Sequence, residues 1–440
     1  MEEAMPTDFE SGVMRKVAWR LVPFLSFAYL INALDRFNIS MAALTMNKAL
    51  GLSATTYGLG AGAFFWSYVL FQMPANAMLV RFGPRRWIGF VIAFWGVCST
   101  GTAFVTGETS FVIVRFLLGV AESGFFPGVA YFLTRWFPAL YRGRAMGVFY
   151  AFAAAAGIIG GPLSAGLLML DGWLGIAGWQ WIFLVEGVPA IILAVFCTMI
   201  IDDRPSEARF LNAEERGWLD STLESERAQA TGKNLSFLRA LATPTIAILT
   251  LVYLLIAMGI YGQAFFLPLM IKGLGFSNTM VGYVSAVPAI FGAAGMILVA
   301  RSSDRTGERM WHVMVPLLIG GAGLILAGFT LTMNAWLVIA AFSLASFGML
   351  GSLPVFWSLP TAFLSATAAA SGIAFINSVG NISGYAAPQF VGIVHDTTGS
   401  YQLPMLVMGM IVLIGGLLVP VAVRRQFRQV PVTADGFIPE

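Results

Sequence analysis

Charged residues are scarce in this chain. Its 440 residues include 25 Lys and Arg and 22 Asp and Glu, so 11% of the chain is charged, against about 25% in an ordinary soluble protein. So few charges cannot cover a water-facing surface, which argues against a soluble enzyme and against a disordered chain. The net charge of +3 offers no strongly basic surface for nucleic acid. With 58% hydrophobic residues, the chain is expected to lie mostly in a lipid bilayer.

Cysteine and histidine are almost absent as well. The two cysteines, Cys98 and Cys197, sit in apolar runs, which excludes a disulfide framework and favours two small buried side chains. The two histidines, His312 and His395, are expected to have no acidic partner at a metal-ligand spacing. The sequence also lacks a phosphate loop, an HExxH motif and a GxSxG motif. We therefore expect no enzyme activity, no catalytic residue, no metal and no cofactor.

Long apolar runs dominate what is present. A helix that crosses a bilayer needs about 20 apolar residues, and only helices or closed barrels satisfy their backbone in lipid. The runs are too long and too uniformly apolar for barrel strands. They predict twelve transmembrane helices, at residues 19–47, 57–80, 87–106, 111–134, 145–170, 179–201, 243–271, 279–300, 312–333, 336–364, 371–394 and 403–423.

Basic residues predict the orientation, because cytoplasmic loops are enriched in Lys and Arg. One side of the membrane receives Lys48 and Lys272, whereas basic clusters recur on the other side, at residues 15–20, 81–86, 135–144, 204–239, 301–309 and 424–428. Both termini are therefore expected in the cytoplasm. The acidic N-terminus lacks the basic region of a secretory signal. The expected domains are a cytoplasmic N-terminus (1–18), two six-helix bundles (19–201 and 243–423), a cytoplasmic linker with a short helix N-capped by Asn212 (202–242), and a cytoplasmic tail (424–440).

A short repeat indicates that the two halves are duplicates. Residues 81–85 and 305–309 share the pattern Arg-x-Gly-x-Arg, and each follows the second span of its half. The match is short, but its equivalent position in a six-plus-six layout supports duplication. Transporters built in this way bind substrate near the bilayer midplane, between their repeats.

Five ionisable residues remain inside the expected spans, and all belong to the first half: Asp35, Arg36, Arg115, Glu122 and Glu186. Such residues are costly in lipid and normally have partners. One interpretation is structural ion pairing, of Asp35 with Arg36 and of Arg115 with Glu122. The other is that an arginine binds a substrate carboxylate while the acids carry protons. Glu186 lies nearer the outer edge and is expected to have a structural hydrogen-bonding role.

The second half supplies uncharged polar residues instead. These are Tyr261, Gln263, Ser358, Asn377 and Asn381. Pro360 is expected to interrupt the helix beside Ser358, and interrupted helices usually line a cavity. In the first half, Tyr68 either packs within an aromatic run or points its hydroxyl inward. A charged wall facing a hydrogen-bonding wall suits a small, polar, charged substrate.

Several motifs together resemble the major facilitator superfamily and, more narrowly, its anion:cation symporter family. This family includes organic-anion/proton symporters such as tartrate, phthalate, hydroxyphenylacetate and sugar-acid transporters. The resemblance covers nearly the whole chain, and the segment Arg115-Phe-Leu-Leu-Gly-Val-Ala-Glu122-Ser-Gly-Phe-Phe-Pro-Gly128 is its most specific part. The other matching segments are Asp35-Arg-Phe-Asn-Ile39, Phe71-Gln-Met-Pro-Ala-Asn76, Arg81-Phe-Gly-Pro-Arg-Arg-Trp87, Gly160-Gly-Pro162, Asp203-Arg-Pro205 and Asn377-Ser-Val-Gly-Asn381.

The resemblance implies proton-driven import of an organic anion by alternating access, in a multi-pass protein of the bacterial cell inner membrane that functions as a monomer. It implies that Asp35 and Glu122 carry protons, that Arg115 pairs with Glu122 and tunes it, and that Arg36 binds the substrate. Substrate contacts are expected from Tyr68, Ser358, Asn377 and Asn381. The chain departs from the family pattern at Ala33, where many members have tyrosine, and at Ala153, where sugar-acid transporters have glutamine. These departures favour an aromatic or compact carboxylate over a long sugar acid.

Two other functions are compatible with parts of the sequence. A proton-driven exporter of drugs or amphiphiles is indicated by Gly157-Ile-Ile-Gly-Gly-Pro-Leu-Ser-Ala-Gly166, which resembles a proline–glycine motif of exporters. The two membrane arginines, Arg36 and Arg115, disfavour it because they would repel cationic amphiphiles. A receptor or an integral-membrane enzyme is disfavoured because the expected membrane interior, away from the ends of the spans, contains no histidine and no nucleophile–base set.

Overall fold

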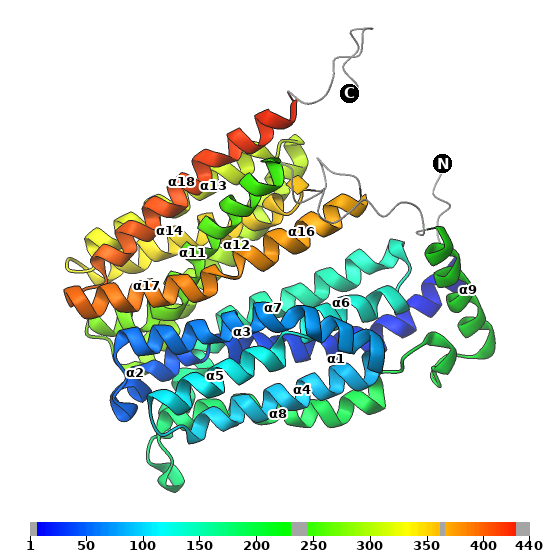
Figure 1. The fold of residues 1–440 in the computed structure, drawn as a ribbon, viewed down its shortest axis with the longest axis horizontal. Coiled ribbons are helices and arrows are strands. Elements are labelled where there is room, and N and C mark those ends of the chain that lie inside the picture. The colour runs from blue at the N-terminus through cyan, green and yellow to red at the C-terminus, as the bar shows by residue number, and fades with distance from the viewer. Residues whose placement is uncertain (1–6, 230–243, 361–365, 428–440) are drawn as a thin grey trace. The chain divides into compact units, whose positions relative to one another are not determined.

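The structure, a computed structural model, describes residues 7–229, 244–360 and 366–427. All regular elements among these residues are helices (Figure 1). The earlier ones are α1 (Asp8–Phe37), α2 (Ile39–Leu50), α3 (Ala54–Phe82), α4 (Pro84–Gly101), α5 (Glu108–Glu122), α6 (Phe125–Trp136), α7 (Ala139–Leu168), α8 (Gly178–Ile200) and α9 (Ala213–Gln229), with short 3-10 helices at Thr102–Phe104, Trp173–Gly175 and Pro205–Glu207. The later ones are α11 (Pro244–Gly273), α12 (Asn278–Thr306), α13 (Met310–Thr330), α14 (Ala335–Phe356), α16 (Ala366–Gly380), α17 (Ser383–Thr398) and α18 (Gln402–Phe427).

Eleven helical segments among the described residues are long and apolar enough to cross a membrane. Two of them join helices that run almost continuously, namely Asp8–Leu50, which contains α1 and α2, and Glu108–Trp136, which contains α5 and α6. The expectation of an all-helical, multi-pass membrane protein is confirmed. Eleven of the twelve expected spans coincide with these segments, whereas the expected span 371–394 falls on α16 and α17, which have 15 and 16 residues.

Contacts divide the chain into two compact units. The first unit comprises residues 1–52, 59–232 and 277–286, and the second comprises residues 53–58, 233–276 and 287–440. Within the first unit α4 packs along α8 and α1 packs along α7, and within the second α13 packs against both α14 and α18. The domain boundaries expected from the sequence remain a prediction, and residues 230–242 of the expected linker lie outside the described residues.

Proline explains why the fourth expected span is divided into two helices. Pro127 has no backbone N–H and therefore cannot donate to the carbonyl of Ser123. The helix α5 ends one residue earlier, at Glu122, and α6 begins at Phe125. The interruption at Ser123 and Gly124 places the last carboxylate of α5 beside a break in the helix.

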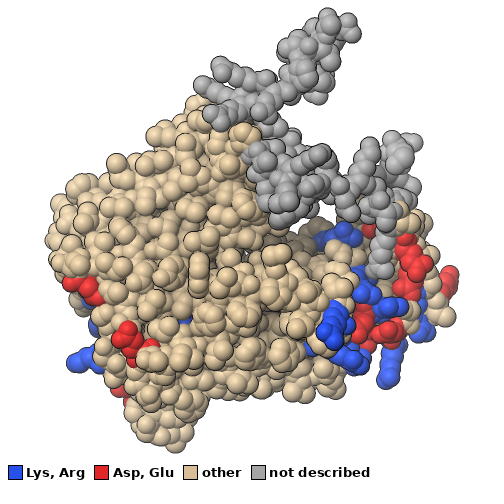
Figure 2. All heavy atoms as spheres, in the orientation of Figure 1, with Lys and Arg blue, Asp and Glu red and all other residues tan. Residues whose placement is uncertain are grey.

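The short helix of the linker begins as its sequence predicts. Asn212 Oδ1 accepts a hydrogen bond from the Glu215 backbone N–H (2.8 Å), and Glu215 accepts one from the Asn212 backbone N–H (2.9 Å), which is a capping box. Glu215 also pairs with Lys16 of α1, and this hydrogen bond helps to lower the pKa of Glu215 below its ordinary value. Figure 2 shows Lys, Arg, Asp and Glu side chains gathered at this end of the first unit.

The glycine of each Arg-x-Gly-x-Arg segment has a positive φ angle. Gly83 has a φ of 82° and Gly307 a φ of 69°, in the left-handed region that glycine enters without strain. Each glycine directly follows one helix and lies in the connection to the next, from α3 to α4 for Gly83 and from α12 to α13 for Gly307. The positive φ at equivalent positions supports the duplication that the sequence pattern indicates.

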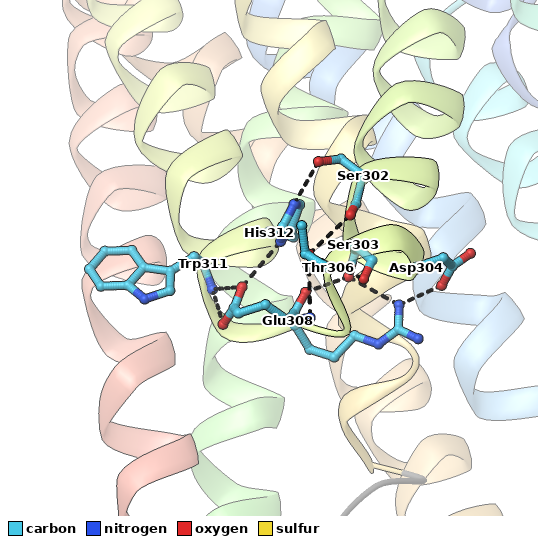
Figure 3. Close-up of polar contacts among 8 residues, drawn as sticks. Ser302, Ser303, Asp304, Thr306, Glu308, Trp311 and His312 are labelled. Atoms are coloured by element: carbon cyan, nitrogen blue, oxygen red, sulfur yellow. Dashed lines mark hydrogen bonds and ion pairs between the residues drawn. The ribbon is translucent and has the colours of Figure 1, made fainter.

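A carboxylate also accepts a hydrogen bond from a backbone N–H at the start of the helix that follows each glycine. In the first unit the Arg85 backbone N–H donates to Asp203 Oδ1 (2.9 Å). In the second unit the Trp311 backbone N–H donates to Glu308 Oε2 (2.9 Å), as Figure 3 shows. The two acids come from different places in the sequence, so the duplicated turns reach the same solution with different residues.

His312 lies in the same turn and corrects one expectation. The sequence predicts no acidic residue at a metal-ligand spacing from either histidine, but Glu308 lies four residues before His312, with its Oε2 atom 3.1 Å from His312 Nδ1, and His312 Nε2 lies 2.9 Å from Ser302 Oγ (Figure 3). His395 Nδ1 similarly lies 3.7 Å from Asp396 Oδ1. Partial burial raises the pKa of Glu308, but hydrogen bonds from Trp311 and His312 outweigh it and leave that pKa below its ordinary value. The spacing of four residues between Glu308 and His312, one helical turn, is the signal in the sequence that predicts this contact.

Close packing in the first unit depends on a glycine of α5. A Cβ atom at Gly119 would lie 2.1 Å from the Phe64 carbonyl oxygen and 2.2 Å from Ser67 Oγ of α3. Ser67 Oγ also donates to the Phe116 carbonyl (2.7 Å), so the hydroxyl is already engaged. Small residues at such positions allow helices to approach closely in membranes, and here they hold α3 against α5.

Replacing Gly119 with alanine is therefore expected to lower the apparent melting temperature of the purified protein in detergent. Overpacking of this kind costs about 1–3 kcal/mol. Gly147→Ala is the matched control, because a Cβ atom at that position of α7 meets nothing within 4 Å. Equal melting temperatures for the two variants would contradict the close α3–α5 contact.

Candidate functional site

Asp35 lies near the end of α1 and is completely buried. Its Oδ1 atom accepts hydrogen bonds from Ser99 Oγ (2.5 Å) and Asn38 Nδ2 (3.4 Å), and its Oδ2 atom accepts one from Trp95 Nε1 (2.9 Å). Trp95 and Ser99 are one turn apart on α4, so both donors come from the same helix face. The carboxylate thereby ties α1 to α4 through neutral donors.

Trp95 and Ser99 were not predicted as partners of Asp35. Both lie in an apolar run where an indole and a hydroxyl look like ordinary packing residues. Their spacing of four residues places two hydrogen-bond donors on one face of a membrane helix, and buried indole N–H groups usually have an acceptor. That spacing was the available signal, but it does not say which acid lies opposite.

Arg36 reaches in a different direction and pairs with Glu122. The Nη2 atom of Arg36 lies 3.1 Å from Glu122 Oε2, which joins α1 to the end of α5. The Glu122 side chain has no exposed surface, whereas 19% of the Arg36 side chain is exposed. The pair therefore has one fully buried member and one that is partly exposed.

Aromatic rings of α3 surround the same guanidinium. The Cζ atom of Arg36 lies 5.2 Å from the ring centroid of Phe64 and 5.1 Å from that of Tyr68. Arg115 of α5 lies 5.1 Å from the centroid of Phe64 as well. Cations are attracted to ring faces at these distances, more strongly when desolvated. Phe64 thus contacts both membrane arginines, and Tyr68 flanks the one that pairs with Glu122.

This arrangement differs from the structural ion pairing that was one of the two interpretations of the sequence. In that interpretation Asp35 pairs with Arg36, but consecutive residues on a helix point about 100° apart, and the ion pair of Arg36 is with Glu122 instead. Arg115 is completely buried and lies two helical turns before Glu122 on α5. The structure therefore brings Asp35, Arg36, Arg115, Glu122 and Tyr68 into one region of the first unit.

Glu186 of α8 has the structural contact that was expected. It is buried, and its Oε1 atom accepts a hydrogen bond from Ser164 Oγ of α7 (2.8 Å). The bond links two helices of the first unit. It gives Glu186 a helix-bridging role distinct from that of the Arg36–Glu122 pair.

In the second unit, three of the expected polar residues form one hydrogen-bonded group. The Tyr261 hydroxyl of α11 donates to Asn381 Oδ1 (3.2 Å), and Asn381 Nδ2 donates to the Asn377 carbonyl (2.9 Å). Asn381 lies where α16 ends and α17 begins. The group therefore lies at a helix interruption. At such a position, backbone groups that lack an intrahelical partner can form other hydrogen bonds.

The remaining polar residues of the second unit have other surroundings. Ser358 follows the end of α14 at Phe356, in the turn expected there, and its Oγ atom donates to the Val355 carbonyl (2.7 Å). Gln263 is buried and donates to Ser346 Oγ (2.8 Å), which connects α11 to α14. Gln263 thus forms a hydrogen bond between two helices inside the unit. Among the described residues, no group of three or more His, Cys, Asp and Glu is arranged to hold a metal ion.

Comparison with known proteins identifies the family. The Major Facilitator Superfamily model matches residues 25–388. A "putative tartrate transporter" of Agrobacterium vitis is 44% identical over 419 residues, covering 95% of both chains, and a "quinolone resistance transporter" of Acinetobacter baumannii is 37% identical, covering 96% of this chain and 97% of that one.

The fold is shared with solved structures at much lower identity. A bacterial homologue of the human lysosomal transporter Spinster superposes with a TM-score of 0.78 at 18% identity, covering 96% of this chain and 98% of the other. That likeness shows the fold alone. The family match and the full-length relatives confirm the resemblance seen in the motifs. The chain therefore belongs to the Major Facilitator Superfamily and is a multi-pass membrane transporter, not an enzyme.

Proposed function

We propose that this transporter carries a small organic anion, a compact carboxylate, together with protons by alternating access. The observation that carries the proposal is the Arg36–Glu122 pair, in which the arginine keeps 19% of its side-chain surface exposed and the acid keeps none. A guanidinium binds a carboxylate through two parallel hydrogen bonds. The relatives named putative tartrate transporters support a carboxylate substrate.

Competition for Arg36 provides a route to coupling. A substrate carboxylate that binds Arg36 removes the main countercharge of Glu122. An uncompensated carboxylate in a buried site is costly, so Glu122 takes up a proton when the substrate binds. Arg115 remains close enough to limit that cost and to favour proton release when Arg36 returns. We assign Asp35 as a second proton-carrying acid, held ready by its donors on α4.

The remaining substrate contacts are proposed to be neutral. Tyr68 flanks Arg36, and Ser358, Asn377 and Asn381 supply hydroxyl and amide groups from the second unit. Alanine at positions 33 and 153 leaves room where some family members have larger polar residues. Tartrate is a compact hydroxy acid, so the relatives named putative tartrate transporters favour a compact carboxylate over a long sugar acid as the substrate. The driving force is a proton gradient, with no cofactor, and a monomer in a bacterial inner membrane suffices.

An exporter remains the second candidate because one full-length relative is named a quinolone resistance transporter. Quinolone antibiotics carry a carboxyl group, so Arg36 would serve either function. The membrane arginines still disfavour cationic amphiphiles. The direction of substrate transport under a defined proton gradient distinguishes the importer from the exporter.

The purified protein in liposomes is expected to accumulate labelled tartrate when the external pH is lower than the internal pH. Accumulation should collapse when a protonophore dissipates the gradient. A labelled quinolone under the same gradient is the comparison substrate. Absence of gradient-dependent accumulation across tartrate, aromatic carboxylates and sugar acids would contradict the importer. Extrusion of the quinolone alone would establish the exporter.

Arg36→Lys is expected to weaken carboxylate binding by about tenfold or more, because a point charge replaces a two-pronged donor and one charge-assisted hydrogen bond is lost. Calorimetric titration of the purified protein measures the change. Arg144→Lys is the matched control, since Arg144 is exposed at the start of α7 and has no proposed role. Equal affinities for both variants would remove Arg36 from substrate binding.

A further inference from the structure

A polar hollow lies at the end of the first unit, remote from the Arg36–Glu122 pair along α1. Its volume is about 700 Å³, and its lining includes Arg20, Arg85, Met199, Asp202, Arg209 and Phe210. These residues come from α1, α4, the end of α8 and the start of the linker. The positive-inside pattern places this end of the unit at the cytoplasmic face of the membrane. The hollow therefore sits where the headgroups of the inner leaflet would be.

The arginines of the hollow differ in how far their charge is already compensated. Arg85 donates to the Thr198 carbonyl, and its Nη1 atom lies 3.8 Å from Asp202 Oδ1. Arg20 donates to the Met199 carbonyl (3.3 Å) and lies against the Phe210 ring at 5.5 Å. Among the described residues, the ion pairs include neither Arg20 nor Arg209.

The acids of the hollow leave a positive balance. Asp202 is engaged with Arg85, and Glu207 also lines the cavity. Three guanidinium groups therefore face two carboxylates. Phe210 holds Arg20 in place and itself stacks on Trp136, with ring centroids 5.9 Å apart. The hollow thus presents two arginines suited to bind an anionic group.

The surface beside the hollow is apolar and exposed. Along α8, exposed apolar residues recur every three or four positions and end at the hollow: Val185, Val188, Ile192, Val195, Phe196 and Met199, with exposed fractions of 39–68%. This spacing forms a single stripe on the helix. Trp19, next to Arg20, is 76% exposed, as is typical of tryptophan at a membrane–water interface. A ligand with a phosphate head and hydrocarbon tails matches this combination, whereas a free phosphate would use only the arginines.

We propose that the hollow binds the headgroup phosphate of an anionic phospholipid of the inner leaflet. Arg20 and Arg209 donate to the phosphate oxygens, and the acyl chains lie along the α8 stripe. Basic pockets on the cytoplasmic side of membrane proteins bind anionic headgroups by the same electrostatics. A bound lipid would connect α1 to the start of the linker, because Arg20 and Arg209 belong to these two segments.

Native mass spectrometry of the full-length protein with phosphatidylglycerol or phosphatidylcholine in mixed micelles tests the proposal. We expect retention of phosphatidylglycerol and not of phosphatidylcholine. Arg20→Gln/Arg209→Gln should weaken retention about thirtyfold, since each basic residue near an anionic headgroup contributes a factor of about five. Arg15→Gln/Arg144→Gln is the matched control, because it removes the same charge from exposed positions that do not line the hollow.

Further variants and ligands distinguish a bound lipid from a bound free phosphate and from a general effect of surface charge. Arg20→Lys/Arg209→Lys, which keeps the charge, should retain more phosphatidylglycerol than the glutamine variant at an equal melting temperature. Inorganic phosphate at millimolar concentration should not displace the lipid. Displacement by phosphate, or equal loss of retention in the control variant, would overturn the lipid site. Unchanged retention in the Arg20→Gln/Arg209→Gln variant would overturn it as well.

Discussion

A carboxylate with no exposed surface needs a countercharge to stay ionised inside a membrane-embedded helical bundle, because desolvation makes an isolated charge costly. Arg36 supplies that countercharge to Glu122. The pair determines how the end of α1 meets the end of α5, and it draws the rings of Phe64 and Tyr68 around the guanidinium. Close packing at Gly119 holds α3 and α5 together beside it. The need to compensate the charge of Glu122 therefore determines the arrangement of these helices around Arg36. Arg36 is partly exposed, so it is the member of the pair that we propose binds the substrate.

The helices and the intramembrane charges were predictable from sequence for simple physical reasons. A bilayer requires long apolar runs, so the spans stand out, and a charge within such a run is conspicuous because it is expensive. The pairing among the charges was not predictable. Asp35 and Arg36 are neighbours in sequence, yet helix rotation sends one to donors on α4 and the other to Glu122 on α5. The contacts of Trp95 and Ser99 depend on the same rotation, which a linear pattern does not contain.

The two units share their helix connections but differ in the polar residues of their membrane interiors. The turns at Gly83 and Gly307 both have a positive φ, and in both a carboxylate accepts a hydrogen bond from a backbone N–H at the start of the next helix. The membrane interiors of the units differ, since the first holds the ion pair while the second holds the Tyr261–Asn381 hydrogen bond at a helix interruption. The similar turns give both units the same kind of helix connection. The different interior residues give the first unit an ion pair and the second unit neutral hydrogen bonds.

The central claim is that a substrate carboxylate displaces Glu122 from Arg36 and that Glu122 then binds a proton. The most direct measurement is proton uptake by the purified protein in weakly buffered solution when tartrate is added, followed with a pH-indicator dye. The account predicts uptake of about one proton per bound substrate, lost in Glu122→Gln and retained in Glu186→Gln, whose parent residue is also buried but bonds to Ser164. Tartrate binding without proton uptake, or unchanged uptake in Glu122→Gln, would contradict it.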